Sequence, residues 1–332
     1  MKAAVIGAGT WGTAFALHLG RRRVGTSLWV REKKVLAELR RTRENRTFLP
    51  GFPLPRAVSF SSDVQRTASS ADMLFIAVPS QFFRAVFLEI ADGLSGDQVV
   101  VSLTKGIEEG SLKRMTEVMT EVMAGRRLPQ LAVLSGPSFA REVAEKHPTA
   151  VVVASGSNDA ACRVQRLISD LSLRCYTSSD VLGVELAGAT KNVIAIAAGI
   201  SDALKYGHNS RAALITRGLA EITRLGLGLG ARKETFFGLA GIGDLVLTCT
   251  AMMSRNYHVG FELGKGRALQ EVLAGMKNVA EGVATTVSVR DLARQQAVEM
   301  PIVEEVYRIL HHGKAPQDSI RDLMQRALKG EA

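Results

Sequence analysis

The sequence has 332 residues, and single hydrophobic cores rarely grow beyond about 250–300 residues, so two domains are expected. Hydrophobic residues make up 46% and charged residues 22%, a composition that excludes long disorder and leaves apolar surface for two cores. The formal net charge is +10. The basic residues are spread along the chain with few aromatic residues among them, so we expect no nucleic-acid partner and an attraction for small anions.

The sequence also lacks targeting and metal-binding signals. No apolar run approaches the ~18 residues of a membrane span, and no cleavage site of small residues follows the first apolar run. The three cysteines, Cys162, Cys175 and Cys249, have unrelated spacings that fit neither a disulfide framework nor a metal site. We therefore expect a cytoplasmic protein with no integral membrane segment and no bound metal.

A stretch rich in glycine lies near the N-terminus and organises the first part of the chain. Apolar residues 3–6 predict a strand, and residues 13–19 predict a helix. Between them, Gly7 would allow a sharp turn, Gly9 would let phosphates approach the backbone, and Gly12 would let the helix pack on the strand. The order of strand, turn and helix favours a dinucleotide site over a turn that is merely rich in glycine.

The end of the second predicted strand, residues 26–30, bears on the choice of cofactor. An Arg about 20 residues after the glycines accommodates a 2′-phosphate, whereas a carboxylate there binds the 2′-hydroxyl of NAD. Arg31 therefore favours NADPH, and Glu32 beside it keeps NADH possible. A surface arginine without a ligand is the competing interpretation.

Further apolar runs predict strands at residues 73–78, 99–103, 131–134 and 150–154. Helices are expected between them, including one that starts at Pro79–Ser80 with Phe82 among its buried residues. Residues 40–56 are rich in Arg and Pro and are expected to form a loop. The alternation predicts an α/β domain over residues 1–180, built as a Rossmann-like, doubly wound and largely parallel sheet.

Two of these strands are followed by residues suited to a ligand. Ligands bind at the carboxyl ends of the strands in open parallel sheets, so Lys105, directly after residues 99–103, is placed to touch substrate. Ser135, Gly136 and Ser138 follow residues 131–134 and indicate a turn into another helix, with Ser135 or Ser138 as its N-cap. A cap would be needed with or without a ligand.

The second domain, residues 181–332, is expected to be mainly helical, with turns near Gly275, Gly282, Gly313 and Pro316. Its first helix, residues 181–204, is apolar nearly all round, which is typical of a helix buried inside a domain.

Lys191 lies in this apolar helix, and its neighbours three and four residues away are all apolar or Gly. Desolvation would lower the pKa of its amine toward the range useful for proton transfer. We therefore favour a catalytic Lys191 over a lysine whose amine extends to the surface.

Other polar residues of the second domain are candidates for the same site. Asp244 is the only charge in the glycine-rich stretch 237–245, and Lys191 is its candidate partner because a buried carboxylate needs a cation. Ser254, Arg255 and Asn256 are three adjacent hydrogen-bond donors, and the guanidinium group suits phosphate oxygens. Such a tripeptide is common and says little alone.

Seven motifs taken together resemble the bacterial-type NAD(P)-dependent glycerol-3-phosphate dehydrogenases over essentially the whole chain. They are G-A-G-T-W-G (7–12), L-T-K-G-I (103–107), S-G-P-S-F-A-R-E (135–142), L-A-G-A-T-K-N-V-I-A-I-A-A-G (186–199), N-S-R-A-A-L-I-T-R-G-L-A-E (209–221), G-L-A-G-I-G-D-L-V-L-T-C-T (238–250) and S-R-N (254–256). The resemblance implies reversible oxidation of sn-glycerol 3-phosphate to dihydroxyacetone phosphate, a supply of glycerol 3-phosphate for phospholipid synthesis, and a homodimer.

The resemblance also implies roles for individual residues. Lys191 would be the proton acceptor, with Lys105 and Asp244 beside it in the catalytic group. Substrate would be surrounded by Lys105, Gly136, Ser138, Lys191, Asp244, Ser254, Arg255 and Asn256. NAD or NADP, with NADPH favoured, would be contacted by the glycine loop and by Thr10, Trp11, Arg31, Lys105, Ala140, Arg255, Val279 and Glu281.

The chain departs from the family pattern at two places. Thr10 stands where Ser is frequent and keeps the hydroxyl, whereas Glu32 stands where His often follows the arginine, which bears on the choice between NADP and NAD. Two other functions remain open: a dehydrogenase of similar build that acts on a carboxylated hydroxy acid, and a non-catalytic Rossmann protein that senses the cofactor.

Overall fold

The computed structural model describes residues 1–276, 279–328 and 330. An eight-stranded sheet in the first part of the chain has the strand order β3-β2-β1-β4-β5-β6-β7-β8. The strands are β1 (Lys2–Ile6), β2 (Gly25–Trp29), β3 (Val58–Ser61), β4 (Met73–Ile76), β5 (Val99–Ser102), β6 (Gln130–Ser135), β7 (Thr149–Ser155) and β8 (Leu173–Ser178). Their core residues are apolar on both faces because helices cover the sheet.

The helices of this part lie between the strands in chain order. They are α1 (Thr10–Arg21), α2 (Lys33–Thr42), α3 (Val64–Ser69), α4 (Ser80–Ala91), α5 (Met115–Val122), α6 (Ala140–Ala144) and α7 (Asn158–Ile168). The Rossmann-like α/β architecture predicted from the alternating pattern is confirmed.

One pair of strands departs from the parallel arrangement. β6 and β7 are antiparallel, whereas the other paired strands run parallel. The connection between β6 and β7 carries only the five-residue helix α6, which is shorter than the helix of an ordinary parallel crossover. The strands β3 and β8 at the two edges, and the short helix α3, were not predicted because their apolar patterns are short and broken.

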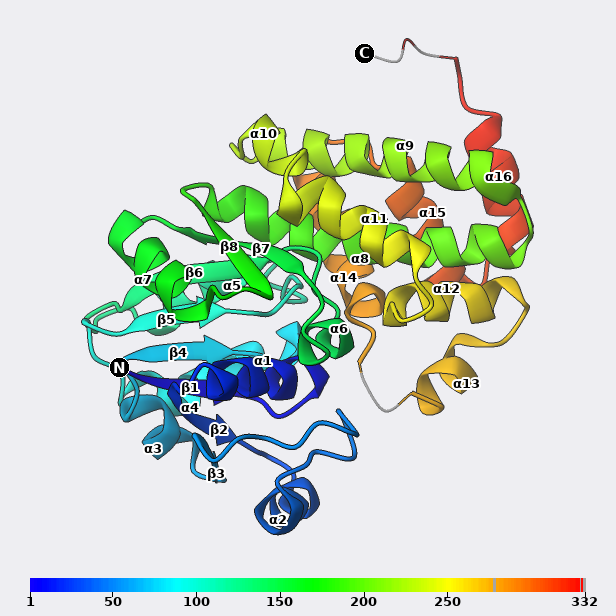
Figure 1. Ribbon diagram of the computed structural model, residues 1–332. Helices are drawn as coiled ribbons and strands as arrows, with labels where there is room; N and C mark the ends of the chain where they lie inside the picture. Colours follow the sequence, from blue (N-terminus) through cyan, green and yellow to red (C-terminus); the bar gives the residue numbers. More distant parts are fainter. Residues whose placement is uncertain (277–278, 329, 331–332) are drawn as a thin grey trace.

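The second part of the chain is helical in all its described elements (Figure 1). They are α8 (Val181–Ala203), α9 (Gly207–Gly228), α10 (Lys233–Phe236), the π turn η1 (Leu239–Gly243), α11 (Asp244–Thr250), α12 (Arg255–Gly264), α13 (Leu269–Ala274), α14 (Glu281–Gln295), α15 (Pro301–His312) and α16 (Pro316–Met324). α8 runs through the middle of this part, between α9 and α12 (Figure 1).

α8 is long and apolar enough to cross a membrane by length and composition. Most of it is buried against α9, α11, α12 and α14, however, so its apolar character reflects its place in the core. Its N-terminus is capped by Asp180, which accepts hydrogen bonds from the backbone N–H groups of Gly183 and Arg232.

Several local predictions were wrong. Helix α2 extends to Thr42 into the expected loop. α14 begins at Glu281, so the break expected near Gly282 lies at the start of this helix, where Gly282 packs closely on Asn192. Neither Ser135 nor Ser138 caps a helix: α6 starts after Phe139 without a side-chain cap, and the Ser138 hydroxyl donates to the Gly136 carbonyl oxygen at 3.0 Å.

Candidate active site

A cleft of about 500 Å³ lies where the carboxyl ends of β1, β2, β4 and β5 meet the helical domain. Most of the site residues expected from the sequence line it, namely Gly7, Gly9, Thr10, Trp11, Arg31, Lys105, Ser138, Ala140, Lys191, Asp244, Ser254, Arg255, Asn256, Val279 and Glu281. Of the described residues expected at the site, Gly12 and Gly136 are not part of this lining. The cleft thus brings together segments from both ends of the chain.

The glycine loop has the geometry that a close approach of phosphate requires. Gly7 has a φ of +112°, and a Cβ on Gly12 would lie 1.9 Å from the carbonyl oxygen of Gly7, so neither position accepts another residue without strain. A Cβ on Gly9 would meet nothing within 4 Å, which shows that this residue faces open space at the start of α1. The start of a helix places backbone N–H groups and the positive end of the helix dipole where an anion can approach.

Asn45 holds the glycine loop in place and was not found from the sequence. Its amide nitrogen donates to the carbonyl oxygen of Ala8 and to the Thr13 hydroxyl, both at 2.8 Å. The side chain is fully buried, so these bonds are shielded from water. No local pattern predicts this contact, because Asn45 lies in a loop 37 residues from Ala8.

Arg31 and Glu32 both lie exposed at the rim of the cleft, after β2. The Arg31 guanidinium carbon is 5.9 Å from the centroid of the Phe82 ring. Phe82 is 47% exposed and lines the cleft, so its predicted place on the buried face of α4 was wrong. Phe82 is in the first turn of α4, which follows the carboxyl end of β4, so it lies beside Arg31 at the cleft instead of in the core.

The deepest part of the cleft holds two lysines on one carboxylate. Lys191 Nζ lies 2.9 Å from Asp244 Oδ1, and Lys105 Nζ lies 2.7 Å from Asp244 Oδ2. Lys105 also donates to the carbonyl oxygen of Gly136 at 3.0 Å, which is how Gly136 takes part without lining the cleft. The Lys191–Asp244 pair suggested by the sequence is therefore present, and Lys105 completes it.

Burial sets the protonation of this cluster. Lys191 is 6% exposed, and burial, together with the nearby Lys105 ammonium, lowers its pKa to about 8 although Asp244 opposes the shift. Burial alone would raise the pKa of Asp244, but Lys105 and Lys191 outweigh it and hold that pKa below its usual value. Asp244 therefore stays ionised while Lys191 can exchange a proton near neutral pH.

Thr248 orients the Lys191 amine and was also missed. Its hydroxyl donates to the Asp244 carbonyl oxygen at 2.6 Å, so toward Lys191 Nζ, also at 2.6 Å, the same oxygen can only accept. Two of the three positions on Nζ are thus taken by Thr248 and Asp244, and the third is left for the cleft. The spacing of four residues between Asp244 and Thr248 in α11 was the available signal, since such pairs share one helix face.

The residues Ser254 to Asn256 also make hydrogen bonds that hold the helical domain together. The Ser254 side chain caps α12 by accepting from the Tyr257 N–H at 3.2 Å, and Asn256 Oδ1 accepts from the Gly282 N–H at 2.9 Å. Arg255 donates to the carbonyl oxygen of Val279 at 2.7 Å. One nitrogen of the guanidinium group is thus anchored on the residue that it bonds, and the Arg255 side chain lines the cleft.

The described residues contain no group of three or more His, Cys, Asp or Glu side chains placed to hold a metal ion. The charged side chains of the cleft are instead four cations (Arg31, Lys105, Lys191, Arg255) and three carboxylates (Glu32, Asp244, Glu281), and with the hydroxyl and backbone N–H groups this excess of cations suits phosphates. Such a lining fits a nicotinamide dinucleotide at the glycine loop and a small phosphorylated molecule near Lys191.

The chain matches two family models, described as the N-terminus and the C-terminus of NAD-dependent glycerol-3-phosphate dehydrogenase, over residues 2–161 and 180–321. It is 50% identical over 331 residues to a glycerol-3-phosphate dehydrogenase [NAD(P)+] of Syntrophotalea carbinolica, covering 100% of this chain and 99% of the relative. A relative of the same name from Geobacter sulfurreducens is 52% identical over 98% of each chain.

A solved structure agrees with these relatives. The crystal structure of glycerol-3-phosphate dehydrogenase from Coxiella burnetii superposes with a TM-score of 0.93 at 39% identity, covering 98% of this chain and 99% of the other. Sequence and fold therefore match over the whole length of the relatives, and the chain belongs to the family of NAD-dependent glycerol-3-phosphate dehydrogenases.

Proposed function

We propose that the chain catalyses the reversible oxidation of sn-glycerol 3-phosphate to dihydroxyacetone phosphate with NAD or NADP. The observation that carries this function is the buried Lys191, held by Asp244 and Thr248 in the same cleft as the glycine loop. A binding protein that only senses the cofactor has no use for an amine kept near its pKa at that place.

The proposed reaction has two parts, a hydride transfer to the cofactor and a proton transfer to Lys191. A bound nicotinamide supplies the acceptor for the hydride that leaves C2 of the substrate. Lys191, in its neutral form, accepts the proton of the C2 hydroxyl group through the free position on Nζ, so that C2 becomes a carbonyl carbon. In the reverse direction the ammonium form of Lys191 donates this proton to the forming hydroxyl group.

Charge in the cluster binds the substrate phosphate. While Lys191 keeps its proton, Lys105, Lys191 and Asp244 carry one net positive charge, and Glu281 offsets part of the charge of Arg255. A phosphate dianion supplies the negative charge that this group lacks, whereas glycerol does not. The phosphate is thus the group by which the site selects its substrate.

A substrate panel tests this function. Consumption of NADH or NADPH should depend on dihydroxyacetone phosphate, and glycerol or a carboxylated hydroxy acid should be very poor in the oxidation direction. Arg255→Ala should lower kcat/KM for glycerol 3-phosphate by ~2–4 kcal/mol, through lost contacts and lost positioning. Arg267→Ala is the matched control, because Arg267 pairs with Glu262 at the far end of α12. Turnover of glycerol close to that of glycerol 3-phosphate would refute the assignment.

We further propose that the enzyme is a cytoplasmic homodimer that supplies glycerol 3-phosphate for phospholipid synthesis, and that the domains meet at Asp180. The family resemblance supports the first part. The second is supported by β8, which ends at Ser178, and by α8, which starts at Val181. Light scattering of the purified protein tests the dimer, and limited proteolysis near residue 180 tests the boundary.

A further inference from the structure

A hydrogen bond crosses the cleft between residues 201 positions apart. The Ser80 hydroxyl donates to Glu281 Oε2 at 2.6 Å, and the Ser80 backbone nitrogen lies 3.3 Å from Oε1 and 3.4 Å from Oε2. Ser80 is the first residue of α4 and is 1% exposed, and Glu281 is the first residue of α14. The contact therefore joins the start of a helix in the α/β domain to the start of a helix in the helical domain.

This bond ties together the two walls of the cofactor cleft. Pro79 and Phe82, on either side of Ser80, line one wall, and Val279 and Glu281 line the opposite wall. A contact of 2.6 Å between the walls fixes their separation at this point. Oε1 has only the longer approach from the Ser80 nitrogen, which leaves it able to accept from a hydroxyl group in the cleft.

Gly106 shows how closely the groups are packed. A Cβ on Gly106 would lie 2.3 Å from the Ser80 hydroxyl oxygen and 2.6 Å from Glu281 Oε2, so no side chain fits there while the bond is intact. Gly106 directly follows Lys105, whose ammonium group is turned to Asp244. The bond between Ser80 and Glu281 thus packs against the residue that follows Lys105 of the catalytic cluster.

The charges around Glu281 favour its ionised form only in part. Burial raises the pKa of Glu281, while the two Ser80 donors and the Arg255 guanidinium lower it. The N-terminus of α4 adds a positive dipole end beside the carboxylate. Arg255 from α12 is the cation that faces Glu281, because the Lys105 ammonium is engaged by Asp244 and Gly136. Ser80 is thus a main source of stabilisation for the carboxylate.

We propose that Ser80 is a positioning residue for the cofactor, which acts by holding the Glu281 carboxylate across the cleft. The proposal rests on the proposed function, in which this cleft holds NAD or NADP. Loss of the hydroxyl would leave the Glu281 carboxylate with only the longer hydrogen bonds from the Ser80 backbone nitrogen, so the two walls would be held less firmly and cofactor affinity should suffer more than the chemical step.

Ser80→Ala tests the proposal. The Kd for NADPH and for NADH, measured by fluorescence titration, should rise about tenfold, while kcat at saturating cofactor falls by less than threefold. Ser80→Thr, which keeps a hydroxyl, should recover most of the affinity. Ser157→Ala is the matched control: Ser157 caps α7 by accepting from the Ala160 N–H, so it removes a hydroxyl at a helix start away from the cleft.

The pH dependence of cofactor affinity gives a readout that a purely structural role would not move. In the wild type the affinity should fall as the pH drops through the pKa of Glu281, because the protonated group accepts poorly from Ser80. Ser80→Ala should move this fall to higher pH, and Glu281→Gln should flatten it. The proposal is overturned if Ser80→Ala binds the cofactor with the same Kd as Ser157→Ala. It is also overturned if Ser80→Ala loses half of its cofactor affinity at the same pH as the wild type.

The same titrations separate this proposal from the proposed function. A wild type that turns over glycerol 3-phosphate, with Ser80→Ala unchanged in cofactor Kd, overturns only the role of Ser80. A wild type that binds NADPH but never turns over the substrate, with the affinity lost in Ser80→Ala, supports Ser80 and overturns the enzyme function.

Discussion

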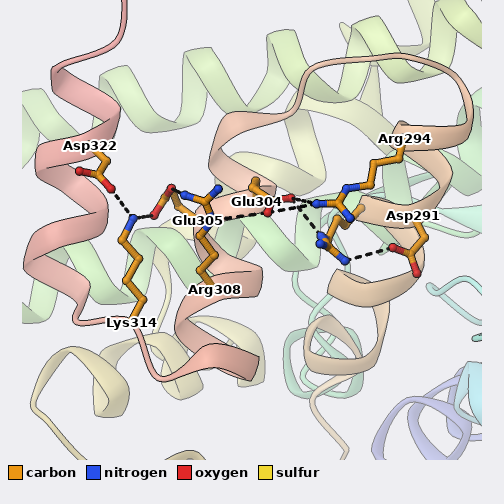
Figure 2. Close-up of polar contacts among 8 residues, drawn as sticks. Asp291, Arg294, Glu304, Glu305, Arg308, Lys314 and Asp322 are labelled. Carbon is orange, nitrogen blue, oxygen red and sulfur yellow. Dashed lines mark hydrogen bonds and ion pairs between the residues drawn. The ribbon is translucent and has the colours of Figure 1, made fainter.

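Two clusters of charged side chains use the same groups in different surroundings. The catalytic cluster consists of Lys105, Lys191 and Asp244 and has two cations for one anion; Lys191 and Asp244 are buried, whereas the Lys105 side chain is 20% exposed. The C-terminal network joins α14, α15 and α16 (Figure 2) and has four cations and four anions, namely Arg290, Arg294, Arg308, Lys314, Asp291, Glu304, Glu305 and Asp322. Of the two clusters, only the first has more cations than anions.

The difference shows in the pKa of a lysine in each cluster. Burial lowers the pKa of Lys191 to about 8, whereas at Lys314 hydrogen bonds to Asp322 and Glu305 outweigh burial and raise the pKa. Figure 2 shows Lys314 between those two carboxylates, whose charges favour the ammonium form. An ion pair thus holds helices together where each lysine has carboxylates to match its charge, and Lys191 becomes reactive because its amine is buried and shares a single carboxylate with Lys105.

The largest test of this contrast removes the Lys191 amine. Lys191→Ala should lower kcat by the ~10²–10⁴-fold typical of a lost general acid or base. Lys191→Arg should fare little better, because a guanidinium group keeps its proton at any working pH. Steady-state kinetics measure the loss, and a fluorescence titration should show that the cofactor still binds.

Lys265→Ala is the control for this test, since Lys265 is exposed and pairs with Glu262 on the surface. If Lys191→Arg turned over substrate at a near-normal rate, positive charge would suffice at this position. The role in proton transfer would then pass to Lys105, the other lysine at Asp244.

The pH dependence of kcat tests the same cluster, and its expected effect is smaller than that of Lys191→Ala. Because Lys191 must be neutral to accept a proton, kcat for oxidation should rise about tenfold per pH unit below its pKa of about 8 and level off above it. The reduction needs the ammonium form, so its rate should fall above that pH. Rates measured in both directions from pH 6 to pH 10 check these opposite signs.

Asp244→Asn makes this test more specific, because it removes the carboxylate that raises the pKa of Lys191. The midpoint of the oxidation profile should move to lower pH. A midpoint that stays in place would show that Asp244 does not set the pKa of Lys191.

The same pKa shift affects folding stability. Folding lowers the pKa of Lys191, so between pH 8 and the ordinary pKa of a lysine the unfolded chain binds the proton more tightly than the folded chain. The free energy of unfolding contributed by this group should therefore rise with pH across that window.

Arg31 is an exposed charge at the rim of the cleft, and we expect the effect of its removal to be intermediate. Arg31→Ala should weaken NADPH more than NADH, by about 1.5 kcal/mol, the lower end for a charge-assisted hydrogen bond because the side chain is exposed. Glu32→Gln is the matched variant and should weaken NADH instead. The ratio of kcat/KM with NADPH to kcat/KM with NADH measures the effect of each variant. Equal losses with both cofactors in Arg31→Ala would show that Arg31 does not contact the 2′ position of the cofactor.

The smallest effect is expected in the C-terminal network. Arg294 is 58% exposed and lies 3.4 Å from Glu304, so Arg294→Ala should cost less than ~1 kcal/mol in the free energy of unfolding, with kcat unchanged. Urea unfolding at low and high salt measures this, and salt should shrink the difference because it screens exposed charges. A cost of several kcal/mol would mean that the network is as tightly coupled as the buried cluster.

The sequence by itself determined the features that depend on local order. The glycine loop, the alternation of apolar strands with helices, and a lysine inside an apolar helix could be found because backbone conformation and burial follow from periodicity and spacing over a few residues. Lys191 was therefore recognised as unusual before its partners were known.

Only the tertiary structure decided which groups meet. Lys105 and Asp244 are 139 positions apart and Ser80 and Glu281 are 201 apart, so their contacts depend on how the two domains pack. The exposed Phe82, the antiparallel β7 and the role of Asn45 were missed for the same reason. Periodicity predicts that a side chain is buried or exposed, but its neighbours across a cleft are set by long-range packing, which the local pattern does not contain.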